Sequence, residues 1–460
     1  MRTLLEKLEL NLSGKLLFMF IMLDLVIIVL VLLSAVKGSL FLIFPLTLGI
    51  VLILFLNYKL SLYLLLVSLF LRYDIYLMGK YFVLMDLVSI LLVFSFLGYF
   101  LMSGSFSIKK TVLDRSIFIF LAVLLLSLLN TIDLANGIRV YIWHLQVFSI
   151  YFLISWSVDT QEVPRFLKFF ILLVSIHSVY TLFQFWLSSG RVRAFGLAGP
   201  SIADLTIGGL IICYSFFLFE DRANKRLTYG FLFLLLLGSL LATQTRGALM
   251  SFSLIYLILS GLALTKANRL KLLFFKRRIL ISLSLVVLGT GILLLVYPEL
   301  LKRVHHGFYY LPGRYIETTQ IRFYLWGLAL KSFIHYPILG IGLGQFYNLV
   351  QVFPGLRFSP LVFYIYGLDP HNIVLYYLSS AGIFGIIAFF YFFLSVLKMG
   401  WTKFKRSVVP QDLSISFALL GIVLFVFISS FYTGEWFYRV SGIEFLFFMG
   451  LLNVFKPKVQ

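Results

Sequence analysis

The stretch from Asn372 to Leu397 reads NIVLYYLSSAGIFGIIAFFYFFLSVL and contains no Asp, Glu, Lys or Arg. An α-helix needs about 20 predominantly apolar residues to cross the hydrocarbon core of a bilayer, so this stretch predicts a transmembrane helix. Runs of the same kind recur from one end of the 460-residue chain to the other. The predicted fold is therefore an all-α polytopic bundle in a membrane.

Apolar runs bounded by charge, glycine or proline give fourteen candidate spans. They are 16–36, 40–56, 60–71, 81–102, 116–129, 138–158, 166–188, 201–219, 227–242, 248–264, 279–297, 372–397, 413–431 and 437–454. The runs at 60–71 and 116–129 are short for a span. We therefore expect 12–14 transmembrane helices.

The composition excludes several classes of protein. Hydrophobic residues make up 61% of the chain and charged residues 12%, against about 25% charged in an ordinary soluble domain. Cys213 is the single cysteine, which excludes internal disulfides and cysteine-based metal sites. The chain has no HExxH, CxxC pair, Walker-type GxxxxGK or GxSxG motif, so zinc peptidase, ATPase and α/β-hydrolase functions lack support. We expect no metal and no cofactor. The glycines of GIGLG (340–344) lack a βαβ context and predict a flexible or tight turn.

The 38 Lys and Arg outnumber the 18 Asp and Glu, giving a net charge of +20. With a cytoplasmic N-terminus, 24 of the 38 basic residues fall in cytoplasmic segments, as the positive-inside rule expects. Both termini are then cytoplasmic, and the protein is predicted to be multi-pass in a bacterial inner membrane. Topology accounts for most of the charge, so it does not indicate nucleic-acid binding.

The outer segments hold ten Arg and four Lys, whereas the cytoplasmic segments hold nine Arg and fifteen Lys. The positive-inside rule concerns the total of Lys and Arg, and it does not require the ratio of Arg to Lys to differ between the two sides. A guanidinium group binds phosphate with two parallel hydrogen bonds, so an arginine-rich outer face indicates an anionic, phosphorylated ligand. The alternative is chance composition in short loops.

One outer loop is far longer than the others. It divides the chain into an N-terminal bundle (1–297, about 11 spans), a periplasmic loop (298–371) and C-terminal transmembrane helices (372–460). Within the loop, TTQIRFYLWGLALKSFIHYP, from Thr318 to Pro337, predicts an amphipathic helix lying on the membrane or on the bundle.

Three outer residues are candidates for chemistry. Arg246 lies in the short turn before a span, where an arginine requires a partner or water and is a candidate functional residue. Arg322 lies near the start of the amphipathic helix, and His371 follows Pro370 where the next span begins. A helix N-terminus favours a neutral imidazole, which can accept a proton. The alternatives are an interfacial arginine that reaches the head groups and a structural histidine.

Further polar residues in the outer half predict a water-filled cavity that opens outward. They are Asp86, Arg139, His144, Arg191, Arg193, Asp204, Glu435 and Glu444.

Three stretches resemble the O-antigen ligase and polymerase superfamily of bacterial polysaccharide assembly. They are LATQTRGALMSF (241–252), IRFYLWGLALKSFIHYPILGIGLGQF (321–346) and DPHNIVLYYLSSAGIFGIIAFF (369–390). The segment RVRAFGLAGPSIADL (191–205) is similar to the Arg-Gly-Pro segment of that family. Ligases of this type have twelve spans, so the fourteen candidates depart from the family's pattern.

The resemblance implies a metal-independent, inverting glycosyltransferase at the periplasmic membrane face. Its donor would be an undecaprenyl-diphosphate-linked glycan, and its acceptor lipid A-core in a ligase or another lipid-linked glycan in a polymerase. By position, Arg246 and Arg322 match the arginines that bind the donor diphosphate, and His371 matches the catalytic histidine. Arg191 and Arg193 are weaker matches for the same diphosphate-binding role.

The sequence leaves four functions open. A ligase is the first hypothesis, and a polymerase needs the same diphosphate chemistry. A protein O-oligosaccharyltransferase is a third enzyme of this set. A transporter or flippase of anionic lipids would also require a basic outer cavity, although no internal repeat or pair of broken helices is evident in the sequence.

Overall fold

The structure is a computed structural model. It describes residues 58–71, 74–77, 80–103, 109–188, 193–269, 273–296, 318–358, 368–431 and 440–458. The predicted spans 16–36 and 40–56 lie outside these residues.

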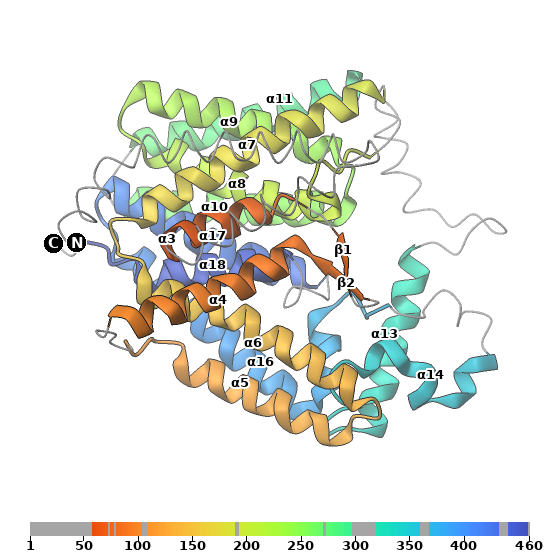
Figure 1. Cartoon of the computed structure of the whole chain (residues 1–460). Coiled ribbons are helices and arrows are strands. Elements are labelled where there is room, and N and C mark those ends of the chain that lie inside the picture. Colours follow the sequence, from red (N-terminus) through yellow and green to blue (C-terminus); the bar gives the residue numbers. More distant parts are fainter. Residues whose placement is uncertain are drawn as a thin grey trace, which may run out of the picture.

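Helices dominate the described part of the chain (Figure 1). The α-helices are α3 (Tyr58–Ser68), α4 (Leu84–Ser103), α5 (Asp114–Ser127), α6 (Leu134–Ser157), α7 (Val163–Leu187), α8 (Ile202–Phe219), α9 (Ala223–Ala242), α10 (Arg246–Arg269), α11 (Leu273–Val296), α13 (Thr318–His335), α14 (Leu349–Val352), α16 (Ile373–Arg406), α17 (Pro410–Ser430) and α18 (Val440–Val454). Short 3-10 helices are η1 (Leu128–Asn130), η2 (Gly199–Ser201), η3 (Gln345–Asn348) and η4 (Pro354–Phe358).

The helical fold is that of a polytopic membrane protein. Among the described residues, seven helices are long and apolar enough to cross a membrane, namely α6, α7, α8, α9, α10, α16 and α17. Large apolar side chains such as Phe118, Phe231 and Leu257 are more than half exposed on the outside of the bundle. A water-facing surface seldom carries so many exposed apolar groups, whereas a lipid-facing surface requires them.

The sequence did not predict the two antiparallel strands β1 (Asp74–Leu77) and β2 (Lys80–Val83). Their cross-strand pairs join Ile75 to Phe82 and Tyr76 to Tyr81. Aromatic and β-branched residues favour such pairs. The predicted span 81–102 therefore begins as a helix only at Leu84.

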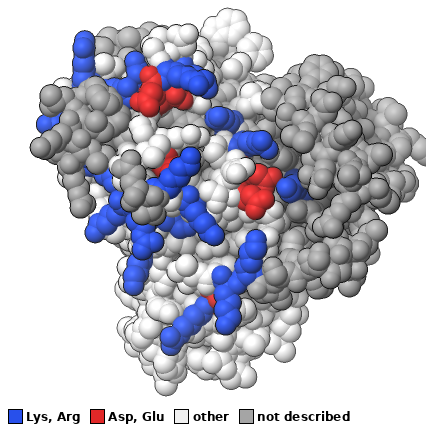
Figure 2. Space-filling model, turned by 90° about the vertical axis from the view of Figure 1, so that its left-hand side faces the viewer, with Lys and Arg blue, Asp and Glu red and all other residues white. Residues whose placement is uncertain are grey.

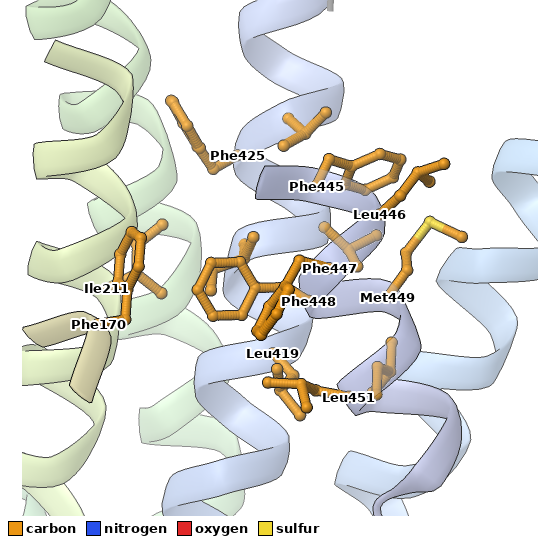
Figure 3. Packing of buried hydrophobic residues seen from close by; sticks show 14 of the residues in the cluster. Phe170, Ile211, Leu419, Phe425, Phe445, Leu446, Phe447, Phe448, Met449 and Leu451 are labelled. Atoms are coloured by element: carbon orange, nitrogen blue, oxygen red, sulfur yellow. The ribbon is translucent and has the colours of Figure 1, made fainter. Parts of the chain in front are cut away.

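The core of the bundle forms around α8, α17 and α18, with helices from both halves of the chain against them. Helix α17 packs on α8, α18 on α6, and α16 on α5. Figure 3 shows aromatic side chains of α18 in this core, where the Phe448 ring meets the Phe170 ring of α7 at a centroid distance of 4.9 Å. The C-terminal helices thus share one hydrophobic core with the N-terminal bundle.

The bundle has one strongly basic end. There the Lys266 ammonium, at the end of α10, donates hydrogen bonds to Phe404 and Lys405 carbonyls of α16, at 3.2 and 3.1 Å. The Lys403 ammonium donates to carbonyls at the end of α18, including that of Leu452 at 2.6 Å. Figure 2 looks onto this end and shows many Lys and Arg side chains spread across it.

Elements outside the bundle helices gather at the opposite end. The β1–β2 hairpin, α13 and α14 lie there (Figure 1, right). Helix α13 confirms the helix that the sequence predicts from Thr318, and it ends at His335, just before Pro337. Leu325 and Leu328 are its buried contacts with the protein.

Helix α16 is broken at Gly382, whose φ is 64° and ψ is −155°. The Ile383 amide donates a 2.8 Å hydrogen bond to the Pro337 carbonyl. A Cβ at Gly382 would collide with the Ile338 carbonyl. Only glycine therefore fits this position, both sterically and conformationally.

A segment that we call the glycine strap (residues 337–345) completes the backbone hydrogen bonding of this break. The Ile341 amide donates to the Ser379 carbonyl at 2.9 Å, and the Gly342 amide donates to the Ser380 carbonyl at 3.2 Å. Irregular backbone inside a membrane protein is tolerated where protein groups satisfy it in this way. The GIGLG motif is thus a tight turn, with positive φ at its three glycines.

Candidate functional site

The His371 segment lies directly before helix α16. The helix begins at Ile373 and is capped by Asn372, whose Oδ1 accepts a 3.1 Å hydrogen bond from the Leu375 amide. Asn372 thus satisfies a free amide of the first turn, as an N-cap residue does. Pro370 lies two residues before this cap, so it precedes the helix and does not occupy its first turn. His371 lies one residue before the cap, with a φ of 48°.

A buried carboxylate holds His371. Asp369 is fully buried, and its Oδ1 lies 3.1 Å from Nδ1 of the His371 ring. The same oxygen accepts a 2.7 Å hydrogen bond from the His371 amide. The carboxylate therefore fixes both the backbone and the ring of His371, whose side chain is 32% exposed.

Helix α13 is joined to this segment. The Trp326 indole Nε1 donates a 2.8 Å hydrogen bond to the Pro370 carbonyl. Arg322 lies one turn before Trp326 on α13. Burial lowers the pKa of the Arg322 guanidinium, and attraction to the Asp369 carboxylate opposes that effect. Arginine remains charged at neutral pH, so its positive charge attracts the Asp369 carboxylate, which also contacts the His371 ring.

Arg246 is the first residue of α10, as the sequence predicts for the turn after α9. The Thr245 carbonyl accepts the first α10 hydrogen bond, from the Leu249 amide at 3.0 Å. Gln244 before it has a φ of 50°. The half-buried Arg246 guanidinium and the open amides of the helix N-terminus together form an arrangement that attracts anions.

Arg193 lies beside the same turn. The amide of its neighbour Ala194 donates a 3.3 Å hydrogen bond to the Ala242 carbonyl, at the end of α9. Arg193 itself is exposed. Arg191 lies outside the described residues. The structure thus brings together Asp369, His371 and Arg322 in one group, and the segments of Arg193 and Arg246 in another.

Both groups lie at the same end of the bundle. Helices α10 and α16 meet at their basic C-terminal ends, through Lys266 and Phe404. Their N-termini, which carry Arg246 and adjoin His371, therefore lie at the other end, with α13 (Figure 1).

Two backbone positions in these segments are strained. Within the described residues, Gln244 and His371 are the non-glycine residues with positive φ. A left-handed conformation costs an L-residue about 1–2 kcal/mol. Such strain persists where surrounding structure enforces it, and it concentrates at functional sites.

The contact of Asp369 with His371 is not predicted from the sequence, and His144 lies in different surroundings from those predicted. Asp369 stood two residues from His371 in the quoted motif, which was the available signal. His144, expected beside a water-filled cavity, is buried, and its Nε2 lies 3.0 Å from the Tyr377 hydroxyl. In the described part of the chain, no three His, Cys, Asp or Glu side chains lie close enough together to hold a metal ion.

One known family matches part of the chain. Residues 231–390 match the family model described as O-antigen ligase. The match runs from α9 into α16 and includes Arg246, Arg322 and His371. This match, over about a third of the chain, supports the O-antigen ligase and polymerase superfamily and, in general terms, a glycosyltransferase-like activity on lipid-linked glycans. No curated protein matches the chain.

Proposed function

We propose that this protein is an O-antigen ligase. It would transfer a glycan from undecaprenyl diphosphate to lipid A-core at the periplasmic face of the bacterial inner membrane, by an inverting reaction without a metal. The observation that carries the proposal is Asp369, which contacts the His371 ring and attracts the Arg322 guanidinium. One buried carboxylate thereby contacts the base and attracts a phosphate-binding group.

The distribution of charge supports a periplasmic location for the His371 end of the bundle. Basic residues accumulate in cytoplasmic segments, so the end with Lys266 and Lys403 is assigned to the cytoplasm. The opposite end, with His371, Arg246 and α13, then faces the periplasm. Both termini are cytoplasmic in this assignment.

The arginines act on the leaving group. Breaking the bond between the anomeric carbon and the phosphate oxygen leaves negative charge on the diphosphate. Guanidinium groups already in place stabilise that charge more strongly in the transition state than in the ground state. We assign this role to Arg246 and Arg322, with Arg193 and Arg191 as further contacts to the donor diphosphate.

His371 acts on the acceptor. When Nδ1–H donates to Asp369, the lone pair of the ring is on Nε2, which can take the proton of the attacking sugar hydroxyl. The hydroxyl oxygen bonds to the anomeric carbon as the phosphate oxygen departs, and undecaprenyl diphosphate is released. Asp369 orients the imidazole and stabilises the imidazolium that forms.

The test uses the full-length protein in lipid nanodiscs with purified lipid-linked donor. We expect free undecaprenyl diphosphate to appear only when lipid A-core is present. His371→Ala and Arg246→Ala should abolish release while membrane insertion is unchanged. His335→Ala, an exposed histidine at the end of α13, is the matched control and should retain wild-type activity. Normal transfer by both site variants would overturn the assignment.

The acceptor separates the alternatives. Release that requires a second lipid-linked glycan would identify a polymerase. Release that requires a Ser or Thr peptide would identify a protein O-oligosaccharyltransferase. Translocation of the donor across the bilayer without release would identify an anionic-lipid transporter.

A further inference from the structure

A polar cavity of about 330 Å³ lies near the start of α6, apart from the groups assigned above. Its lining residues come from α6, the residue before it, and η3. They are Asp133, Ala135, Asn136, Arg139, Tyr347 and Asn348. The volume is at the lower end of the range typical of small-molecule sites.

The walls of this cavity are fixed by hydrogen bonds between distant parts of the chain. Gln345 is fully buried, and its Oε1 accepts a 3.0 Å hydrogen bond from the Asp133 amide while its Nε2 donates to the Asp133 carbonyl at 3.1 Å. The Asn136 side-chain amide donates to the Gly344 carbonyl at 2.6 Å. A site that is rigid before binding loses less entropy when a ligand enters.

The lining side chains offer both donors and acceptors. A carboxylate, two carboxamides, a guanidinium and a phenol are present. Arg139 donates to Asn136 Oδ1 and lies over the Trp143 ring, 5.4 Å from its centroid, while much of its side chain stays exposed. The carboxylate of Asp133 would repel a phosphate. A single carboxylate beside a guanidinium also does not suit a metal ion. It suits a ligand rich in hydroxyl groups.

The cavity is joined to the site by the glycine strap. The strap ends at Gln345 beside the cavity, and its Ile341 amide binds the Ser379 carbonyl of α16. Ser379 is seven residues after Asn372, about 10 Å along a helix axis. The strap therefore ties the wall of the cavity to the helix that begins just after His371.

We propose that this cavity is an oligosaccharide subsite that holds sugars remote from the reacting one. The identity of the glycan rests on the proposed function. Two sources share this chemistry, the glycan of the lipid-linked donor and the core saccharide of the acceptor.

The experiment measures binding of two probes to the full-length protein in nanodiscs. One is the oligosaccharide released by mild acid from the lipid-linked donor, and the other is the core saccharide released by mild acid from lipid A-core. Calorimetric titration should show binding of one of them. Arg139→Ala and Asn348→Ala should each weaken that binding about tenfold, as expected when a hydrogen bond between protein and ligand is lost.

Ala135→Trp tests the subsite by filling the cavity with a bulky side chain. Ala135 is exposed and lines the cavity, so a bulky side chain there should exclude the saccharide without disturbing the core. Ala122→Trp, at an exposed position on α5, is the matched control and should bind like the wild type. In the transfer assay, the cavity variants should raise KM about tenfold while kcat stays within about twofold, because sugars remote from the reaction contribute uniform binding.

The outcomes separate this proposal from the proposed function. Binding of neither probe by the wild type, or unchanged binding in Arg139→Ala, Asn348→Ala and Ala135→Trp, overturns the subsite. The wild type could bind a probe, and the variants could lose that binding, while no undecaprenyl diphosphate is ever released. This result would overturn the ligase assignment and leave the subsite proposal intact. The probe that binds identifies whether the subsite serves the donor or the acceptor.

Discussion

Nδ1 of His371 lies 3.1 Å from Oδ1 of Asp369, a carboxylate with no exposed surface. A buried carboxylate of this kind selects the tautomer of the ring and stabilises its protonated form. Asp369 is therefore the residue through which the ring orientation of His371 can be tested without removing the ring.

Asp369→Asn keeps the size of the side chain and removes its charge. We expect kcat for undecaprenyl diphosphate release to fall by about a hundredfold or more, because the amide can present its NH₂ group to Nδ1 and favour the wrong tautomer. KM for the donor should change little. A kcat within twofold of the wild-type value would show that Asp369 does not position His371.

Arg322 can be tested by a pair of substitutions. Arg322→Ala should lower kcat by about a hundredfold, the usual effect of removing a group that stabilises transition-state charge. Arg322→Lys should restore part of the activity, because an ammonium keeps the charge but not the bidentate geometry.

The control for Arg322 lies on the same helix. Lys331 is exposed, with its ammonium 5.1 Å from the Phe353 ring centroid. Lys331→Ala should leave kcat unchanged. Equal losses in Lys331→Ala and Arg322→Ala would indicate a general effect of charge on α13.

Trp326 links α13 to the His371 segment by its hydrogen bond to the Pro370 carbonyl. Trp326→Phe keeps an aromatic ring and removes the donor, and leaves the carbonyl of the buried Pro370 without this partner. We expect kcat to fall by about tenfold through misplacement of the segment. The protein should still insert and unfold near the wild-type temperature. A large fall in thermal stability with unchanged kcat per folded molecule would instead make Trp326 a structural residue.

Gly382 tests the break in α16. Gly382→Ala should destabilise the protein by about 2 kcal/mol or more, because the Cβ meets the Ile338 carbonyl and the φ of 64° disfavours alanine. Gly261→Ala is the matched control, since Gly261 lies within α10 with open space around its Cβ position. That control should be stabilised by about 0.5–1 kcal/mol. Thermal unfolding in nanodiscs measures both, and an equal response of the two variants would contradict the role of the break.

The sequence predicted what depends on local pattern. Apolar runs located the helices, the Thr318 to Pro337 pattern located α13, and the Arg246 turn lies before α10 as expected. It could not predict the break at Gly382, because the strap that satisfies it comes from residues about forty positions earlier in the chain. It also could not assign Asp369, whose burial depends on tertiary packing. Helices α13 and α16, which lie on either side of Asp369 in the chain, pack against each other only in the folded protein.

The glycine strap has a consequence for exchanging parts between related enzymes. Its backbone bonds to Ser379 and Ser380, together with the Asn130 side-chain amide that donates to the Gly340 carbonyl at 2.9 Å, join three segments that are separate in the gene. Replacing the 298–371 loop alone would place a strap from one protein against the α16 helix of another, and their backbone hydrogen bonds would not match. A chimera that exchanges this loop must therefore carry the loop, the first turns of α16 and the α5–α6 connection as one unit.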